Sequence, residues 1–188
     1  VTGVQTCALP ISMETLLARV CAKAGVTPRD LSALGLGVPG FVDSETGMVM
    51  WSSVLMERGV ALRKAASEHL GLPVHVDNDA NLVTLAELWF GAGRTLADFA
   101  VVTIEHGVGM GCVINHRIYR GAKGLGMELG HTKVQLDGAL CRCGQRGCLE
   151  AYVADYALAR EATTALNWSH KEGQTINVLL ESLYDHAK

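Results

Sequence analysis

Glu128-Leu-Gly-His131 and, a little further along, Cys141-Arg-Cys143-Gly-Gln-Arg-Gly-Cys148-Leu-Glu150 form the stretch that decides the fold. One imidazole and three thiols in so short a segment can supply all four ligands of a tetrahedral zinc ion. Thiolates and a neutral ring nitrogen favour Zn²⁺ over hard cations, and Gly144 and Gly147 allow the loop to turn back on itself. Four protein ligands would close the ion to water, so His131, Cys141, Cys143 and Cys148 predict a structural zinc site. The alternative is three reduced cysteines beside an unrelated histidine.

The composition is that of a globular protein without an extreme charge. The chain has 188 residues, which is long enough for one substantial domain or two small ones. Of these residues 49% are apolar, and the formal net charge is −3. The sequence contains no stripe of basic residues that would indicate contact with nucleic acid by this segment. No apolar run approaches the roughly 20 residues that span a bilayer. Cys7, Cys21 and Cys112 lie far apart in the sequence, so reduced thiols in a cytoplasmic protein are expected.

The first residues do not continue into the rest of the pattern. Residues 1–12 read Val-Thr-Gly-Val-Gln-Thr-Cys-Ala-Leu-Pro-Ile-Ser and lack the basic start and long apolar core of a signal peptide. They resemble a translated sequencing adapter. We therefore predict a non-native leader at residues 1–12 and leave it out of the fold argument.

Short apolar runs alternate with helical periodicity along the remaining chain. Helices are predicted at residues 13–24, 60–70, 79–90, 149–166 and 177–186, strands at residues 34–38, 74–76, 99–104, 108–114 and 118–120, and a hairpin at residues 41–52. Strands interleaved with helices predict an α/β sheet whose sites lie at the carboxyl ends of the strands. The glycines at residues 91–96 suggest a boundary there, between a first lobe at residues 13–94 and a second lobe at residues 95–188 that contains the zinc loop.

The zinc segment also carries a resemblance to a known family. Glu-X-Gly-His followed by Cys-X-Cys-Gly-X-X-Gly-Cys-X-Glu resembles the signature of the ROK family, and the similarity runs from about Leu34 to about Ala165. That family comprises sugar kinases and sugar-responsive transcriptional repressors. The resemblance implies an actin/hexokinase-like (ribonuclease H-like) α/β fold of two lobes that bind a sugar between them, with the zinc loop supporting the sugar-binding wall. It also implies a homodimer for the full-length protein.

Two patterns of the family are not found in this sequence. Family members open with a Gly-rich phosphate hairpin of the Asp-X-Gly-X-Thr type, and they carry a late Gly-rich segment that holds adenosine. We therefore expect the fold to be truncated at both ends, so that the chain holds the back of the first lobe and the front of the second.

Asp77-Asn78-Asp79-Ala80-Asn81 lies where a predicted strand meets a predicted helix. In the kinases that this motif resembles, the residue matching Asp79 is the general base that accepts the proton of the sugar hydroxyl attacking the γ-phosphate. The residue matching Asn78 hydrogen-bonds the sugar hydroxyls. The alternative from local sequence is that Asp77 or Asp79 only caps the helix.

Two acidic residues flank the predicted zinc ligands. Carboxylates can accept paired hydrogen bonds from vicinal hydroxyls, and the resemblance makes Glu128 and Glu150 sugar contacts. It adds His131, whose second ring nitrogen stays available when the first binds zinc, and Gly40, whose backbone would approach the sugar. The expected ligand is a hexose or an N-acylhexosamine. The alternative for Glu150 is an acidic residue that stabilises a helix N-terminus.

Gly107-Val-Gly109-Met-Gly111 lies where kinases of the family carry Gly-Thr-Gly-X-Gly. Such a loop presents backbone N–H groups to the phosphates of ATP/Mg²⁺, so Gly107 and Gly109 are the predicted cofactor contacts if the protein is a kinase. Glu105 and His106 replace the first Gly and the Thr of this pattern. A carboxylate repels phosphate and cannot donate a hydrogen bond, which argues against the use of ATP.

Gly59 is a second departure, because kinases of the family often have a sugar-contacting Asn there. These departures favour the effector-sensing part of a carbohydrate-responsive repressor, whose DNA-binding helix-turn-helix would be encoded upstream. The alternative is an ATP-dependent hexose or N-acylhexosamine kinase with Asp79 as general base. A stand-alone zinc-ribbon interaction module is the third hypothesis, and only Arg142 and Arg146 would support it.

Overall fold

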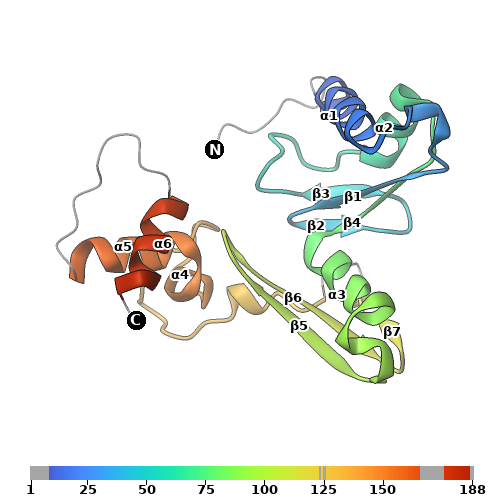
Figure 1. Ribbon diagram of the computed structural model, residues 1–188. Coiled ribbons are helices and arrows are strands. Elements are labelled where there is room, and N and C mark those ends of the chain that lie inside the picture. Colours follow the sequence, from blue (N-terminus) through green and yellow to red (C-terminus); the bar gives the residue numbers. More distant parts are fainter. Residues whose placement is uncertain (1–8, 123, 125, 166–175, 187–188) are drawn as a thin grey trace. The chain divides into compact units, whose positions relative to one another are not determined.

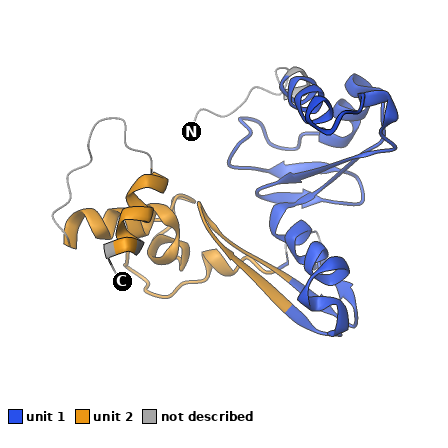
Figure 2. Cartoon of the chain, viewed as in Figure 1, with its two compact units in different colours: residues 1–99, 112–126 blue, residues 100–111, 127–188 orange. Residues whose placement is uncertain are grey.

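The computed structural model describes residues 9–122, 124, 126–165 and 176–186. The chain divides into two compact units, which Figure 2 colours separately. Unit 1 consists of the described parts of Val1–Phe99 and Cys112–Gly126, and unit 2 of those of Ala100–Gly111 and Met127–Lys188. The leader at residues 1–12 and the lobe boundary near residue 94 stay predictions.

Unit 1 is built around a pair of parallel strands and a hairpin (Figure 1). Its first elements are α1 (Leu9–Ala24), a 3₁₀ turn η1 (Pro28–Asp30), β1 (Leu34–Val38), β2 (Phe41–Asp43), β3 (Met48–Trp51), α2 (Leu62–Leu70) and β4 (Val74–Asn78). β1 pairs with β4 in parallel, from Leu34 opposite Val74 to Val38 opposite Asn78, and β2 pairs with β3 in an antiparallel hairpin. The parallel pair carries the carboxyl ends of both strands to one edge, where Pro39 and Gly40 follow β1 and Asp79 follows β4.

The core of unit 1 is made mainly of β-branched side chains. Its buried members are Val38, Val42, Val49, Leu55, Val60, Leu62, Ala66, Val74 and Val76. Valine packs well on a pleated surface, and each fully buried valine or leucine contributes about 1.5–3 kcal/mol. Leu62 and Ala66 lie one helical turn apart and give α2 its buried face. This core fixes the ends of β1 and β4, which carry the candidate residues of unit 1.

α3 (Asp79–Phe90) follows β4 without an intervening loop and ends before Gly91 and the 3₁₀ turn η2 (Ala92–Thr95). β5 (Phe99–Ile104), β6 (Val108–Ile114) and β7 (Arg117–Ile118) then form a three-stranded sheet in that order. The direct passage from β4 into α3 places Asn78 and Asp79 at a strand end and at a helix N-terminus at once.

Unit 2 contains the cysteine-rich loop and short helices. Its elements are the 3₁₀ turn η3 (Leu129–His131), α4 (Glu150–Val153), α5 (Asp155–Ala165) and α6 (Ile176–His186). Cys141, Cys148 and Ala151 form a buried cluster, against which Ala139 and Tyr152 pack. The loop therefore has its own small core, two members of which are predicted metal ligands.

Most of the predicted elements are observed, and the differences at three of the helices have physical reasons. The first helix begins at Leu9 rather than at residue 13, because Pro10 falls in its first turn, where no backbone donor is needed. The helix predicted from residue 60 begins at Leu62, since Val60 pairs with Val49 in an antiparallel bridge. The single helix predicted at residues 149–166 is two helices, because Ala154 is extended and the N–H of Asp155 donates to the carbonyl of Glu105.

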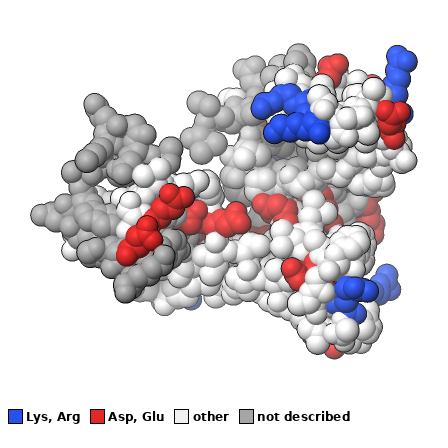
Figure 3. Space-filling model, in the orientation of Figure 1, with Lys and Arg blue, Asp and Glu red and all other residues white. Residues whose placement is uncertain are grey.

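The surface carries charges of both signs. In the view of Figure 3, Lys and Arg side chains gather over the region of α1 and α2, and acidic side chains are spread over both units. Within the described residues, no helix combines the length and the apolar character that crossing a bilayer requires.

Candidate functional site

The four predicted metal ligands come together in unit 2. The ligand atoms of His131, Cys141, Cys143 and Cys148 all lie within 4.8 Å of one another. The Sγ atoms of Cys143 and Cys148 are 3.8 Å apart, and Cys141 Sγ lies 3.8 Å from His131 Nδ1. Sulfurs bound tetrahedrally to zinc at the usual bond length lie about 3.8 Å from one another. The donor set and its spacing therefore fit a four-coordinate soft metal ion.

Backbone hydrogen bonds within the loop hold these side chains in place. Cys141 N donates to Gln145 O at 2.8 Å, and Gly144 N donates to Cys141 O at 3.0 Å. Gly144 and Gly147 have φ values of +85° and +74°, a region that favours glycine. The predicted tight turn of the loop is thus confirmed, and it returns Cys148 towards Cys143.

The cysteines of the cluster differ in their acidity. Burial is the main cause that raises the pKa of Cys141 to about 12, and the nearby Glu150 carboxylate also raises it. Burial opposes the thiolate of Cys148 as well, but hydrogen bonds, first of all from Lys133 Nζ at 3.0 Å, outweigh it and lower the pKa. A metal ion would have to displace the proton of the Cys141 thiol, whereas the lowered pKa of Cys148 favours the thiolate that a metal ion binds.

Glu150 is a buried carboxylate whose two oxygens both have protein partners. Its Oε2 accepts a hydrogen bond from Val108 N at 3.3 Å, and its Oε1 lies 3.5 Å from both Cys141 Sγ and Tyr156 Oη. Burial, followed by Cys141 and Glu150, raises the pKa of Tyr156, so that its hydroxyl stays a donor. Glu150 is also the first residue of α4, in agreement with the alternative of a helix N-terminal acid. Its contact with a sugar stays a prediction.

Glu128 is held next to the cluster through its backbone. Its carbonyl accepts a hydrogen bond from His131 N at 3.1 Å, and it immediately precedes the 3₁₀ turn that ends at His131. Its side chain is exposed. A metal ion that fixes His131 would therefore also fix the backbone from which the Glu128 carboxylate projects.

The predicted phosphate loop between β5 and β6 is tied down within unit 2. His106 Nδ1 lies 3.3 Å from Asp155 Oδ2, and Arg142 Nη1 donates to His106 O at 3.2 Å. A Cβ added at Gly107 would lie 3.1 Å from Glu150 Oε2, whereas Gly109 belongs to β6. Carboxylates therefore surround the turn that would have to receive phosphate oxygens.

In unit 1, Asn78 is the residue that caps α3. Its Oδ1 accepts a hydrogen bond from Asn81 N at 3.1 Å, and its Nδ2 donates to Gly40 O at 3.0 Å. Asp79 is the first helical residue, is exposed, and accepts a hydrogen bond from Ala80 N at 2.9 Å. The alternative that Asp77 or Asp79 caps the helix is therefore wrong. The structure brings Gly40 into contact with Asn78, the neighbour of Asp79, and the roles of these three residues in binding stay predictions.

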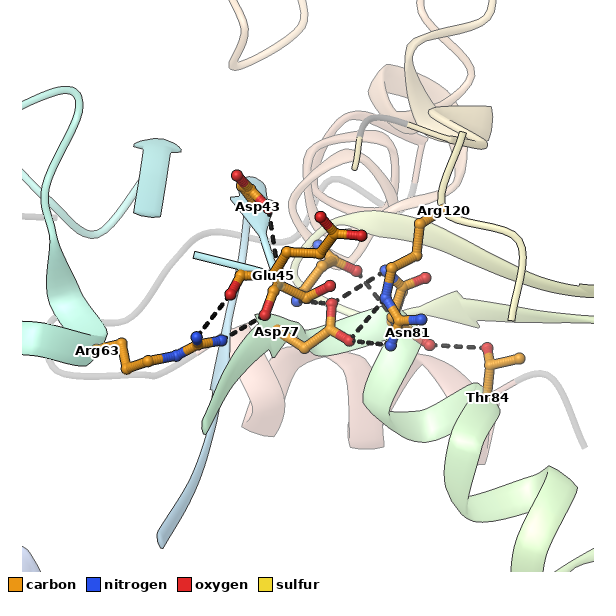
Figure 4. Close-up of polar contacts among 10 residues, drawn as sticks. Asp43, Glu45, Arg63, Asp77, Asn81, Thr84 and Arg120 are labelled. Atoms are coloured by element: carbon orange, nitrogen blue, oxygen red, sulfur yellow. Dashed lines mark hydrogen bonds and ion pairs between the residues drawn. The ribbon is translucent and has the colours of Figure 1, made fainter. Parts of the chain in front are cut away.

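The pairing of Asp77 with Arg120 is the contact that sequence reasoning missed. Asp77 is only 6% exposed, and its Oδ2 accepts hydrogen bonds from Arg120 Nε at 3.1 Å and Nη2 at 2.5 Å (Figure 4). The two residues are 43 positions apart. No local pattern could have paired them, although an Asp before the capping residue was a visible candidate for burial.

Gly40 is required by the backbone around it. It has a φ of +113°, and a Cβ added there would lie 2.3 Å from Trp51 O and 2.9 Å from Ser52 Cα. We expect Gly40→Ala to lower the free energy of unfolding by about 3 kcal/mol or more, in a urea titration followed by circular dichroism.

Gly71 offers the matched control for this substitution. It caps α2 at a φ of +66° and has no atom within 4 Å of an added Cβ. Gly71→Ala should therefore cost only the left-handed conformation, about 1–2 kcal/mol. Equal losses at the two positions would show that contact with Trp51 is not what requires Gly40.

The comparison with known proteins decides the family. A sequence model of the ROK family matches residues 8–186. The chain belongs to the ROK family. Among ROK relatives, it is 36% identical over 143 residues to the xylose repressor of Caldicellulosiruptor bescii and 40% identical over 146 residues to the glucokinase of Halalkalibacterium halodurans. These alignments cover 76% and 77% of this chain.

A solved ROK structure supports the same assignment. The ROK glucokinase of Streptomyces griseus, in complex with glucose and AMPPNP, matches with a TM-score of 0.71 at 35% identity over 82% of this chain. The predicted fold class, an actin/hexokinase-like α/β fold, is thus confirmed. The chain spans 36% and 44% of the two curated relatives and 50% of the solved one. The ROK family includes repressors as well as kinases, so membership alone does not choose between them.

Proposed function

We propose that this chain is the sugar-binding, zinc-containing part of a ROK protein that senses its sugar as a transcriptional repressor of carbohydrate metabolism. The observation that carries the proposal is the cluster of His131 with three cysteines, flanked in the sequence by Glu128 and Glu150. A metal ion bound by this cluster would hold the loop in its folded shape, because the loop has only a small apolar core. The flanking carboxylates offer the acceptors that sugar hydroxyls need.

Zinc has a structural role in this proposal. Bound by one imidazole and three thiolates, it supplies a fixed tetrahedral centre and no open position for chemistry. Cys141 Sγ lies 3.8 Å from His131 Nδ1, so Nδ1 is the proposed ligand atom, and Nε2 is left to donate to a sugar hydroxyl. The chain's own residues then do the binding: Glu128 accepts from hydroxyls, and His131 is held in one tautomer.

The turn between β5 and β6 supports the sensor rather than the kinase. Glu150 already accepts the N–H of Val108, and Asp155 pairs with the ring of His106. Phosphate oxygens would have to displace one carboxylate and lie beside another, which like charges oppose. The first curated relatives favour neither the sensor nor the kinase, because both a xylose repressor and a glucokinase are among them.

The second candidate is an ATP-dependent hexose or N-acylhexosamine kinase, and the exposed carboxylate of Asp79 favours it. Asp79 begins α3, so the helix dipole stabilises its charge. In that reaction Asp79 would accept the proton of the sugar hydroxyl as the oxygen attacks the γ-phosphate. Asn78 would bind a neighbouring hydroxyl only after releasing Gly40 O or the Asn81 amide.

The coding sequence of the full-length gene ahead of the first lobe separates the two candidates. The sensor proposal expects a DNA-binding helix-turn-helix there. The kinase alternative expects an Asp-X-Gly-X-Thr hairpin and no DNA-binding segment. The protein of that longer reading frame should release no ADP from ATP with glucose, xylose or N-acetylglucosamine. Turnover that Asp79→Ala abolishes would reject the sensor proposal in favour of the kinase.

A further inference from the structure

The carboxylate of Asp77 is the most fully bonded acidic group of unit 1. Besides the two bonds from Arg120, its Oδ1 accepts Asn78 N at 2.8 Å and Asn81 Nδ2 at 3.3 Å (Figure 4). Asn81 is itself buried, and its backbone N–H is the one that Asn78 caps. Asp77, Asn78 and Asn81 thus form a closed set of contacts around the junction of β4 and α3.

Arg120 reaches this junction from a distant part of the sequence. Arg120 lies just after β7, and its carbonyl oxygen accepts a hydrogen bond from Gly126 N at 3.0 Å. Its guanidinium presents two N–H groups to a single carboxylate oxygen of Asp77. The Arg120 side chain is 33% exposed and that of Asp77 is 8% exposed, so the acidic partner is the one removed from water.

A buried ion pair of this kind adds little net stability, because desolvation offsets the attraction between the charges. The pair instead fixes the position of the Asp77 carboxylate, because the planar guanidinium of Arg120 restricts where its hydrogen-bond acceptor can lie. Holding the carboxylate of Asp77 holds the amide of Asn78, and Asn78 in turn holds the start of α3. The side chain of Asp79 projects from that start.

We infer that Arg120 is a positioning residue that orients Asn78 and Asp79 through Asp77. The inference rests on the proposed function, in which Asn78 and Asp79 contact the sugar. Arg120 itself touches neither of these residues in any contact observed within unit 1, so its effect on binding would be indirect.

The test compares Arg120→Met with the unsubstituted chain in two measurements. Amide hydrogen exchange at Asn78 and Asn81 should become at least about tenfold faster, because the contacts around the junction loosen. The affinity for glucose, xylose or N-acetylglucosamine, measured by calorimetry at a temperature where both proteins are folded, should fall by about tenfold or more for the sugar that binds. Arg120→Lys keeps the charge without the paired donors and should give an intermediate loss.

Arg63→Met is the matched control. Arg63 is a partly buried arginine of the same unit, and it donates to the carbonyls of Ser44 and Glu45 in the β2–β3 hairpin (Figure 4). Loss of the Arg63 side chain should speed amide exchange in that hairpin. The exchange rates of Asn78 and Asn81 and the sugar affinity should stay within about twofold of those of the unsubstituted chain. If both arginine variants weaken sugar binding equally, Arg120 has no positioning role.

The double variant Asp77→Asn/Arg120→Met separates positioning from stability. Removing both charges should restore the melting temperature towards that of the unsubstituted chain while the sugar affinity stays low. Affinity that recovers together with the melting temperature would overturn the inference, and so would unchanged exchange at Asn78 and Asn81 in Arg120→Met. If the unsubstituted chain binds none of the three sugars, the proposed function fails, and the exchange measurement still decides whether Arg120 orients the junction.

Discussion

Replacing Cys143 by Ser is expected to abolish the proposed binding of zinc and to unfold the cysteine-rich loop of unit 2. Cys143 is exposed, so the substitution leaves no cavity, and loss of the metal ligand is its main effect. Structural zinc sites contribute an apparent free energy of about 10 kcal/mol or more, which a loop with only a small core cannot replace. Elemental analysis should find close to one equivalent of zinc in the unsubstituted chain and less than about a tenth in the variant.

Cys112→Ser is the control for this experiment. Cys112 lies in β6, has a partly buried thiol, and is not among the four clustered ligands. Its substitution should leave the zinc content unchanged. An unsubstituted chain that purifies without metal and shows a normal melting transition would refute the zinc proposal.

The pKa of Cys141 adds a pH dependence to the same measurement. Since burial raises that pKa to about 12, the thiol of the metal-free chain is protonated at neutral pH. Zinc must expel this proton, so the apparent affinity for zinc should rise with pH, by about tenfold per pH unit for each proton released. Proton release can be measured by calorimetry in buffers of different ionisation enthalpy.

Replacing Glu128 by Gln is expected to cause the second largest effect, a loss of sugar affinity of about 10- to 100-fold. A hydrogen bond from a hydroxyl to a carboxylate contributes about 1.5–3 kcal/mol, and the amide keeps the shape while it removes the charge. Calorimetry with glucose, xylose and N-acetylglucosamine measures the change. Zinc content should stay the same, because Glu128 is not among the four ligands.

Glu57→Gln is a suitable control, since Glu57 is an exposed acidic residue of unit 1 outside the candidate site. It should leave the affinity within about twofold, as expected for a surface charge. If Glu128→Gln binds the sugar as tightly as the unsubstituted chain does, Glu128 is not a sugar contact. The zinc proposal would survive that result, because it depends on different atoms.

The difference between the predicted and the observed helices shows where local reasoning ends. Asp79–Phe90 was predicted with both its ends, because the strand-to-helix junction and Gly91 are visible in the sequence. The break at Ala154 was not predicted, since no Pro or Gly marks it. It arises because Asp155 N finds the carbonyl of Glu105, a partner that is distant in the chain.

The identity of the cap at α3 gives the same lesson at a finer scale. Asp77, Asn78 and Asp79 are all good capping residues, so local sequence could not choose among them. In the structure Asn78 is the cap, and the carboxylate of Asp77 is bound by Arg120. The folded structure thus shows which of the three residues is the cap, which propensities left open.

By itself the sequence determined the family, the α/β class and the four residues that cluster as candidate metal ligands. These properties depend on short spacings, because ligands within one tight loop must meet wherever that loop lies. Only the tertiary structure decided that Arg120 binds Asp77, that Glu150 is buried against the β5–β6 turn, and that Asp155 interrupts a helix. Each of these contacts joins residues distant in the chain, and its partner is chosen by which backbone and side-chain groups folding brings within hydrogen-bonding distance.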